Sequence, residues 1–408
     1  MPTLLRDHLL QSLSTYPGSR AFHLHVLESS ARRTDGEPFP HAKGKPKIYV
    51  RDVFVLLSEE REREGGGEET ENLKHSGRVF TTGIESSIYT FPQTKSMMVY
   101  ICKVDSTGYA TKPSPTHQLV LSFIRYFCDQ ENVDDGQGGV SNVWIQLFAR
   151  SQSEYLFLGS KLWKGKKVLG DVGLCGWWKR CLDEVVKGMN GVGKWYVLPG
   201  QSREEAEDAM RNAGAESGES DGWVYGHPYS SSNGPLPCPQ SEGEDLARMV
   251  PYFDDDPKSR FLDELQLDKT LSKVGVDEFW ERMSFRQECI AAVTGFFTVV
   301  VRFGQDRTTT TTTTTARAEI SSQAIDRVKT MLENTSDFST ADKAMKATEL
   351  VEASMEGFCE SGSYKEVVYG SIQTANPNES RKRSQSDGHV TQLVARRKKR
   401  ARTYIDLH

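Results

Sequence analysis

Apolar residues along this chain recur at intervals that switch between the period of a strand and the period of a helix. Alternating or continuous apolar residues predict strands at residues 22–26, 48–57, 97–105, 142–149, 194–199 and 223–226. Apolar residues at every third or fourth position predict helices at residues 3–13, 117–127, 174–189, 276–297, 319–334 and 340–358. Strands interleaved with helices, several of them apolar throughout and so covered on both faces, favour one α/β domain over two.

Polar segments separate several of these elements. Segments rich in charge, glycine, serine or proline are expected to be mobile loops at residues 58–76, 129–140, 229–244 and 305–318. A capping box formed by Ser202 and Glu205 predicts the start of a further helix. The chain turns polar and basic near its end, which predicts a disordered tail over residues 374–408 and a folded domain over residues 1–373.

Composition narrows the class of protein. With 408 residues, 37% of them hydrophobic, and seven Trp, the chain has enough apolar residues for a substantial core. Seven Cys without a C-x-x-C pair argue against a disulfide framework and favour a reducing compartment. No apolar run is long enough to span a bilayer, and the first residues lack the plan of a signal peptide. A soluble, intracellular protein without a membrane partner is therefore expected.

The segment VPYFDDDPKSRF (residues 250–261) places three consecutive aspartates between apolar residues and two cations. In one interpretation Asp256 caps a helix whose first residue is Pro257, where the missing N–H of proline costs nothing. In the other, Lys258 and Arg260 neutralise acids that would be costly to bury alone, and one carboxylate is held ready for proton transfer. Both interpretations can hold together.

Other candidate features are less specific. KPSPT (residues 112–116) before a helix can cradle a phosphate with Lys112 and backbone N–H groups, or can be an ordinary helix start. KGKKVLG (residues 164–170) reads most simply as a solvated loop, and Trp177-Trp178 as core. Motifs of P-loop enzymes, α/β-hydrolases, zinc proteases and dinucleotide-binding domains are absent. Consecutive aspartates seldom converge on one ion, so no metal site is expected.

Four segments carry a more specific signal in combination. In chain order they are KVDSTGY (103–109), LFARSQSEYLF (147–157), Trp177-Trp178 and FDDDPKSRF (253–261), followed by Phe279, Trp280, Glu281, Arg286 and Gln287. In these segments the chain resembles the fungal histone H3 lysine acetyltransferases of the regulator-of-Ty-transposition family. That resemblance implies a CBP-type acetyltransferase fold, with a central mixed β-sheet flanked by helices.

The resemblance also implies roles for individual residues. Asp256, with Asp255 beside it, matches the essential active-site aspartate, and Lys258 matches a lysine that the enzyme acetylates on itself. Asp105 matches a functional aspartate, and Trp178 a tryptophan of the catalytic centre. Contacts with acetyl-CoA, the implied co-substrate, are expected from Val104, Asp105, Ser106, Lys112, Pro113, Ser114, Pro115, Phe148, Gln152, Val168, Leu169 and Trp177.

Elementary chemistry fits these expectations. A lysine ammonium has an ordinary pKa of about 10.4, so a site that acetylates it must remove a proton and desolvate the amine. Trp178, Tyr155 and Phe157 can line an apolar tunnel for the lysine stem. Either Asp256 or Asp105 can orient the ammonium and accept its proton, and the sequence leaves that choice open.

Two basic clusters, at residues 381–383 and 395–402, mark the tail. They are compatible with a solvated tail, a bipartite nuclear-import signal, or a contact with a histone, a histone chaperone or DNA. The resemblance implies a nuclear enzyme that acetylates core-domain and tail lysines of newly made H3 in replication-coupled nucleosome assembly and the response to DNA damage. Its implied partners are H3–H4 and chaperones of the nucleosome-assembly and anti-silencing types, without a central role for direct DNA binding.

Two other classes of function stay open at this point. The first is a non-catalytic chromatin-binding protein that uses the basic tail. The second is a metal-dependent phosphotransferase built on the three aspartates.

Overall fold

A computed structural model describes residues 3–34, 36–62, 76–133, 139–215, 222–230, 233, 236–239, 246–254, 256–304, 320–358 and 364–374. The strands in these residues are β1 (Ala21–Glu28), β2 (Arg32–Arg33), β3 (Tyr49–Glu62), β4 (Ser76–Phe91), β5 (Ser96–Ser106), β6 (Asn142–Ala149), β7 (Val192–Val197), β8 (Trp223–Tyr225), β9 (Gly295–Arg302) and β10 (Tyr369–Gln373). They form one sheet in the order β10-β1-β3-β4-β5-β6-β9-β7-β8, with β2 paired to β3. Parallel pairing of β5 with β6 and of β7 with β8, among otherwise antiparallel pairs, makes the sheet mixed, as expected.

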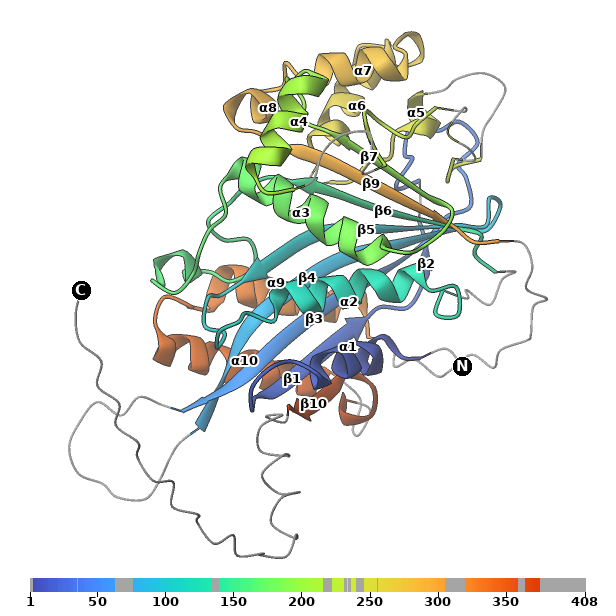
Figure 1. The fold of residues 1–408 in the computed structure, drawn as a ribbon. Coiled ribbons are helices and arrows are strands. Elements are labelled where there is room, and N and C mark those ends of the chain that lie inside the picture. Colours follow the sequence, from blue (N-terminus) through green and yellow to red (C-terminus); the bar gives the residue numbers. More distant parts are fainter. Residues whose placement is uncertain are drawn as a thin grey trace, which may run out of the picture.

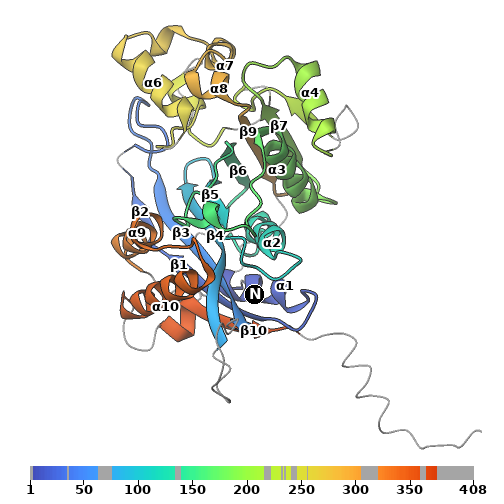
Figure 2. The same ribbon diagram turned by 90° about the vertical axis from the view of Figure 1, so that its left-hand side faces the viewer.

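Helices cover both faces of this sheet (Figure 1). They are α1 (Leu5–Ser14), α2 (Thr116–Cys128), α3 (Asp171–Val186), α4 (Arg203–Asn212), α5 (Leu246–Met249), α6 (Pro257–Leu267), α7 (Val276–Met283), α8 (Gln287–Ala291), α9 (Ser322–Thr330) and α10 (Ala341–Phe358). Figure 2 shows α2, α3 and α4 on one side of the sheet and α6, α9 and α10 on the other. The helices flank a central sheet, which confirms the predicted fold class.

The strand at the centre of the sheet is buried from both sides. Met97, Val99 and Ile101 of β5 face the core under α1 to α4. Met98 and Tyr100, the residues between them, face the core under α5 to α7. A continuous apolar run therefore did indicate a strand covered on both faces.

The predicted helix over residues 276–297 is wrong as a single helix and wrong at its end, because residues 295–297 already belong to β9. Helices α7 and α8 are short, and the chain then enters β9, which lies between β6 and β7. The reason is that the apolar run of β9 is buried on both faces, and such a run has no period that separates strand from helix. Strands β4 and β10 were not predicted either, because β4 buries polar residues such as Thr81, Thr82 and Ser86.

The predicted loops also need correction. Residues 58–62 belong to β3, whereas residues 63–75 lie outside the described residues, as do 305–318 and 375–408. The described parts of the predicted loops at 129–140 and 229–244 contain no α-helix or strand, yet they bury Val133, Tyr229 and Cys238. Among the described residues, no helix combines the length and apolarity needed to cross a membrane.

A substitution in β9 tests its central position. Val299 is fully buried, so Val299→Ala removes apolar contacts and should lower the free energy of unfolding by about 2–3 kcal/mol in urea titrations. Val224 of β8 is 52% exposed, and Val224→Ala should change it by less than about 0.5 kcal/mol. Equal effects of the two substitutions would contradict the burial of β9.

Candidate active site

The two parallel strands at the centre of the sheet diverge at their carboxyl ends. β5 and β6 are paired from Ser96 opposite Asn142 to Ile101 opposite Leu147, where their ladder ends. Beyond this point β5 continues beside β4 and β6 continues beside β9. The strands are pulled apart by their outer partners, and a gap opens between two segments of extended backbone.

A cleft of about 230 Å³ occupies this gap. It brings together five of the residues predicted from the sequence: Val104, Phe148, Gln152, Tyr155 and Trp178. Burial raises the pKa of Tyr155 to about 12, so its phenol is neutral at physiological pH. The cleft is also lined by Cys102, Lys103 and Arg150, which the sequence analysis did not single out. An apolar wall with a few polar groups suits a ligand that is partly apolar.

Asp105 lies beside the cleft and is saturated with hydrogen bonds. Its Oδ2 accepts the backbone N–H of Tyr155 at 2.9 Å and that of Leu156 at 3.0 Å. Its Oδ1 accepts the N–H of Ser106 and the ammonium of Lys166, each at 2.8 Å. The carboxylate thus holds the segment that carries Tyr155 against β5, and this geometry favours a positioning role over proton transfer.

The prediction of a solvated loop at residues 164–170 is wrong for Lys166. Its side chain is 5% exposed and forms an ion pair with Asp105. The rest of the cluster is more open, with Val168 48% and Leu169 43% exposed. Leu169 is tied to the cleft side through its carbonyl oxygen, which accepts a hydrogen bond from Ser151 Oγ.

The KPSPT loop is fixed from below by a buried ion pair. Arg20 and Glu59 form a bidentate pair with distances of 2.8 and 2.7 Å, and Arg20 also donates to the carbonyl oxygen of Pro113 at 2.8 Å. Lys112 and Pro113 are exposed, Ser114 is half-buried and Pro115 is buried. The loop ends where α2 begins, so a helix N-terminus and an exposed lysine occur together.

The tryptophan pair of α3 links this helix start to the cleft. Trp177 is half-buried, and its ring centroid lies 6.0 Å from that of His117 in the first turn of α2. Trp178 packs edge-on against Trp177 at 4.8 Å and lines the cleft. Of the pair, Trp178 thus lies at the cleft and Trp177 lies between the cleft and α2.

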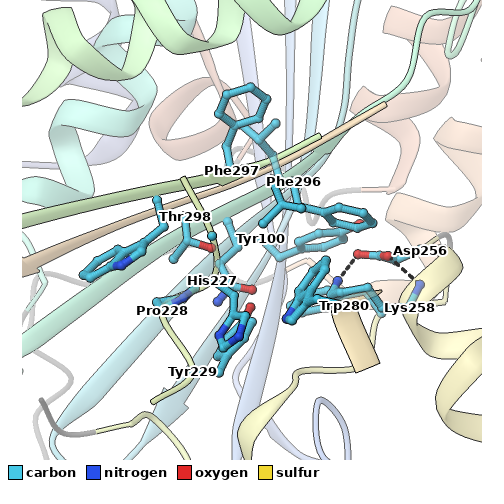
Figure 3. Close-up of a pocket in the computed structure, with 16 residues that line it drawn as sticks. Tyr100, His227, Pro228, Tyr229, Asp256, Lys258, Trp280, Phe296, Phe297 and Thr298 are labelled. Atoms are coloured by element: carbon cyan, nitrogen blue, oxygen red, sulfur yellow. Dashed lines mark hydrogen bonds and ion pairs between the residues drawn. The ribbon is translucent and has the colours of Figure 1, made fainter. Parts of the chain in front are cut away.

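The acidic segment forms both of the structures proposed for it. Asp256 caps α6 by accepting the backbone N–H of Lys258 at 2.9 Å. Its other oxygen accepts the ammonium of Lys258, and the two residues are only 1% and 3% exposed (Figure 3). Asp255 lies outside the described residues, and Asp254 is exposed.

Burial shifts both partners of this pair toward their neutral forms. It raises the pKa of Asp256, although the Lys258 charge opposes the shift, and it lowers the pKa of Lys258. The ammonium is also placed 5.1 Å from the ring centroids of both Phe253 and Phe296. A carboxylate in such a setting accepts a proton more readily than an exposed one.

The pair and the cleft are neighbours without sharing one cavity. Tyr100 and Leu147 line both the cleft and the cavity beside Asp256. Phe148 of the cleft packs on Phe296 with ring centroids 4.7 Å apart, and Phe296 in turn contacts the Lys258 ammonium. Tyr100 was missed in the sequence analysis, although its place in the alternating pattern of β5 puts it on this face.

Comparison with known proteins identifies the kind of domain. Residues 136–355, more than half of the chain, match the histone acetyltransferase KAT11-type domain. The chain belongs to the KAT11-type histone acetyltransferase family. This confirms the resemblance to the fungal regulator-of-Ty-transposition acetyltransferases, because the curated relatives carry that family's name.

Two fungal relatives match a little more than half of this KAT11-type chain. Histone acetyltransferase rtt109 of Schizosaccharomyces pombe is 31% identical over 248 residues, which cover 58% of this chain and 60% of that protein. Histone acetyltransferase rtt109 of Aspergillus flavus is 30% identical over 272 residues, which cover 56% of this chain and 46% of that protein. The matches thus span less than two thirds of either relative.

A solved structure supports the same fold. The crystal structure of Rtt109 from Aspergillus fumigatus superposes with a TM-score of 0.68 at 22% identity, covering 90% of this chain and 99% of that one. The described part of the KAT11-type chain contains no group of three or more His, Cys, Asp or Glu side chains placed to hold a metal ion.

The hydrogen bonds of Asp105 lead to a prediction about its role. Asp105→Asn leaves the Lys166 ammonium buried without a counter-charge, so it should lower the free energy of unfolding by about 3 kcal/mol or more in urea titrations. Glu154→Gln is a matched control, because it removes the acid that pairs with the half-exposed Lys161. That control should cost less than about 1 kcal/mol. A stable but inactive Asp105→Asn protein would instead assign Asp105 to the chemistry.

Proposed function

We propose that this protein transfers the acetyl group of acetyl-CoA to lysine ε-amino groups of histone H3, in its core domain and its tail. The observation that carries the proposal is the cleft between β5 and β6 next to the buried Asp256–Lys258 pair. In a KAT11-type chain this arrangement supplies a place for an extended acyl carrier and a carboxylate with raised proton affinity beside it.

The cleft suits coenzyme A in shape and chemistry. The diverging strands expose backbone groups that can hydrogen bond to the amides of the pantetheine arm, while Val104 and Phe148 supply apolar contacts. At the outer end, Lys112 and the N-terminus of α2 suit the phosphates, with Trp177 beside them. Acetyl-CoA supplies an activated thioester, and the protein has to supply a deprotonated amine in the right place.

Preparation of the acceptor lysine is assigned to the inner end of the cleft. Trp178 and Tyr155 provide a partly apolar wall that disfavours the charged ammonium and so promotes loss of its proton. Asp256 is the better candidate for proton acceptor, because burial raises its pKa whereas Asp105 is committed to five donors from its own fold. Asp105 then acts as a positioning residue.

The partners we propose follow from the relatives. Proteins named histone acetyltransferases share this domain, so H3–H4 is the proposed substrate and the nucleus the proposed location. Histone chaperones of the nucleosome-assembly and anti-silencing types are the proposed partners that deliver the histone substrate. The proposed process is replication-coupled nucleosome assembly. The basic clusters near the C-terminus suit nuclear import.

Incubation with labelled acetyl-CoA, H3–H4 and a histone chaperone tests the function. The wild-type protein should label H3, and Asp256→Asn should abolish turnover because the amide cannot accept the proton. Binding of acetyl-CoA, measured by calorimetry, should stay within a few fold, since Asp256 does not line the cleft.

Asp254→Asn is the matched control, because Asp254 lies two positions away and is exposed. It should keep wild-type turnover. A wild-type protein that labels neither histone nor itself would refute the enzymatic function and favour a chromatin-binding role. An unfolded Asp256→Asn protein would point to the cap, although loss of a cap alone costs only about 1 kcal/mol.

We further predict that the protein acetylates itself, with Lys258 as the acceptor and acetyl-CoA as the acetyl donor. Burial lowers the pKa of Lys258, which favours the free amine that attacks a thioester. Acetylation removes the cation beside Asp256, which should raise the proton affinity of that carboxylate and speed histone acetylation. Intact-mass measurement and peptide mapping of the wild-type protein should find the added acetyl group on Lys258.

Two variants separate self-acetylation from a permanent ion pair. Asp256→Asn should carry no acetyl group on Lys258 if the protein modifies itself. Lys258→Arg retains the positive charge and cannot be acetylated, so it should turn over more slowly than the modified wild type. Full activity with an unmodified Lys258 would show that the ion pair is structural.

A further inference from the structure

A small cavity lies beside the Asp256–Lys258 pair (Figure 3) and shares Tyr100 and Leu147 with the cleft. Asp256 and Lys258 line it at one end and His227 lines it at the other. Its free volume is about 10 Å³, close to the smallest that can hold one ordered water molecule. The cavity is thus lined both by the buried pair and by a half-buried histidine.

Two buried polar atoms on its walls have no protein partner within the described residues. They are Trp280 Nε1 and His227 Nδ1. Trp280 is only 8% exposed. Buried polar groups are nearly always hydrogen-bonded, to ordered water where no protein group is available. The Trp280 N–H group therefore calls for an acceptor inside the cavity.

The hydrogen bond on the outer side of His227 sets the role of its inner nitrogen. Nε2 lies 2.9 Å from Oδ1 of Asp277, a side chain that is fully exposed. A neutral imidazole that donates from Nε2 to a carboxylate has a bare acceptor at Nδ1. One water can then accept from Trp280 and donate to His227, which satisfies both atoms and leaves one lone pair of the water to accept a proton from Asp256.

We propose that this water and His227 carry the proton released by acetyl transfer from Asp256 to the solvent. The inference rests on the acetyltransferase function proposed above. Attack of a lysine on a thioester breaks the thioester C–S bond and forms an amide C–N bond. The ammonium loses two protons in all and the leaving thiolate takes up one, so each turnover releases one proton. That proton passes through the water to His227 Nδ1, while the proton on Nε2 leaves toward Asp277.

The burial of Asp256 makes such a route necessary. Asp256 is 1% exposed, so a proton that it accepts cannot pass directly to bulk water. Tyr229 contributes to the same wall, and burial raises its pKa well above the ordinary value, so it stays a neutral hydrogen-bonding group. The Thr298 and Gln146 side chains act as its hydrogen-bond partners.

His227 is in the right protonation state to receive a proton. Burial lowers its pKa, against the opposing effect of Asp277, so it is neutral near pH 7. The charged and titratable groups that face it are Asp277 from α7, Tyr229, whose ring stacks on His227 with centroids 6.0 Å apart, and Asp256 and Lys258 on the cavity wall. As pH falls through its pKa, His227 becomes charged at the start of the cycle and the rate should drop.

Replacement of His227 in the full-length protein tests the route. His227→Ala should lower kcat for H3 acetylation about tenfold or more, because proton transfer by a positioned group contributes on that scale or above. KM for acetyl-CoA should not change, and added imidazole should restore the rate. The fall in wild-type rate on the acid side, caused by protonation of His227, should disappear in His227→Gln, which keeps a donor to Asp277.

His41→Ala is the matched control. His41 forms a similar pair with Asp263, at 2.9 Å, and its side chain is 17% exposed, but it does not line this cavity. Its rate and imidazole response should equal those of the wild type. Trp280→Phe keeps an aromatic ring and removes the indole N–H that holds the water. It should therefore slow turnover, and added imidazole should not restore the rate.

The outcomes separate this inference from the function beneath it. A wild-type protein without activity overturns the acetyltransferase function. An active wild type with an unchanged rate in His227→Ala and His227→Gln overturns the proton route alone. A slow His227→Ala protein that imidazole does not restore, with an unchanged pH profile in His227→Gln, also overturns it and assigns His227 a structural role.

Discussion

The site of this protein depends on two parallel strands that must separate while each stays paired on its other side, apart from a bulge at Cys102 of β5. β5 leaves β6 after Ile101 but remains bonded to β4 as far as Ser106. β6 remains bonded to β9 as far as Ala149. The backbone in the gap is thus rigid on both sides and open in the middle. Few other arrangements expose extended backbone inside a domain without the cost of unpaired, flexible chain.

Buried ion pairs keep the walls of this gap in place. The pair of Asp105 with Lys166 fixes the segment that bears Tyr155, and Arg20 with Glu59 fixes the loop before α2. Such pairs contribute little net stability, because desolvation offsets most of their attraction. Their value here is geometric, since each carboxylate also accepts backbone N–H groups from a loop. Ion pairs and their hydrogen bonds to backbone N–H groups therefore hold these two loops in place, whereas apolar packing alone would leave the loops free to shift.

The sequence predicts the parts of this site that depend on local order. The run of β5 and the cap at Asp256 followed from neighbouring residues, and both occur as expected. The partners of Asp105 were beyond reach, because Tyr155 and Lys166 lie 50 and 61 positions away along the chain. The first three residues of β9 were assigned to a helix and the rest of the strand was not predicted, since burial on both faces removes the period that distinguishes strand from helix. Patterns of neighbouring residues predict helices and strands, whereas contacts between residues far apart along the chain can be known only from the three-dimensional structure.

The setting of Asp256 imposes two opposing demands on the chemistry. Removal from water raises the pKa of the carboxylate and makes it a better base, and the Lys258 ammonium beside it limits that shift. The same removal from water slows the loss of any proton it accepts. A carboxylate made more basic by burial can act again only if it loses the proton it accepted. Its surroundings must therefore exclude water toward the substrate and admit water at one point on the other side. Phe148 and Phe296 pack with tilted rings between the cleft and the pair, whereas another wall of the cavity beside Asp256 carries Trp280 Nε1 and His227 Nδ1, which lack protein partners in the described structure. The asymmetry of these two walls is therefore what allows one carboxylate to be both buried and reusable.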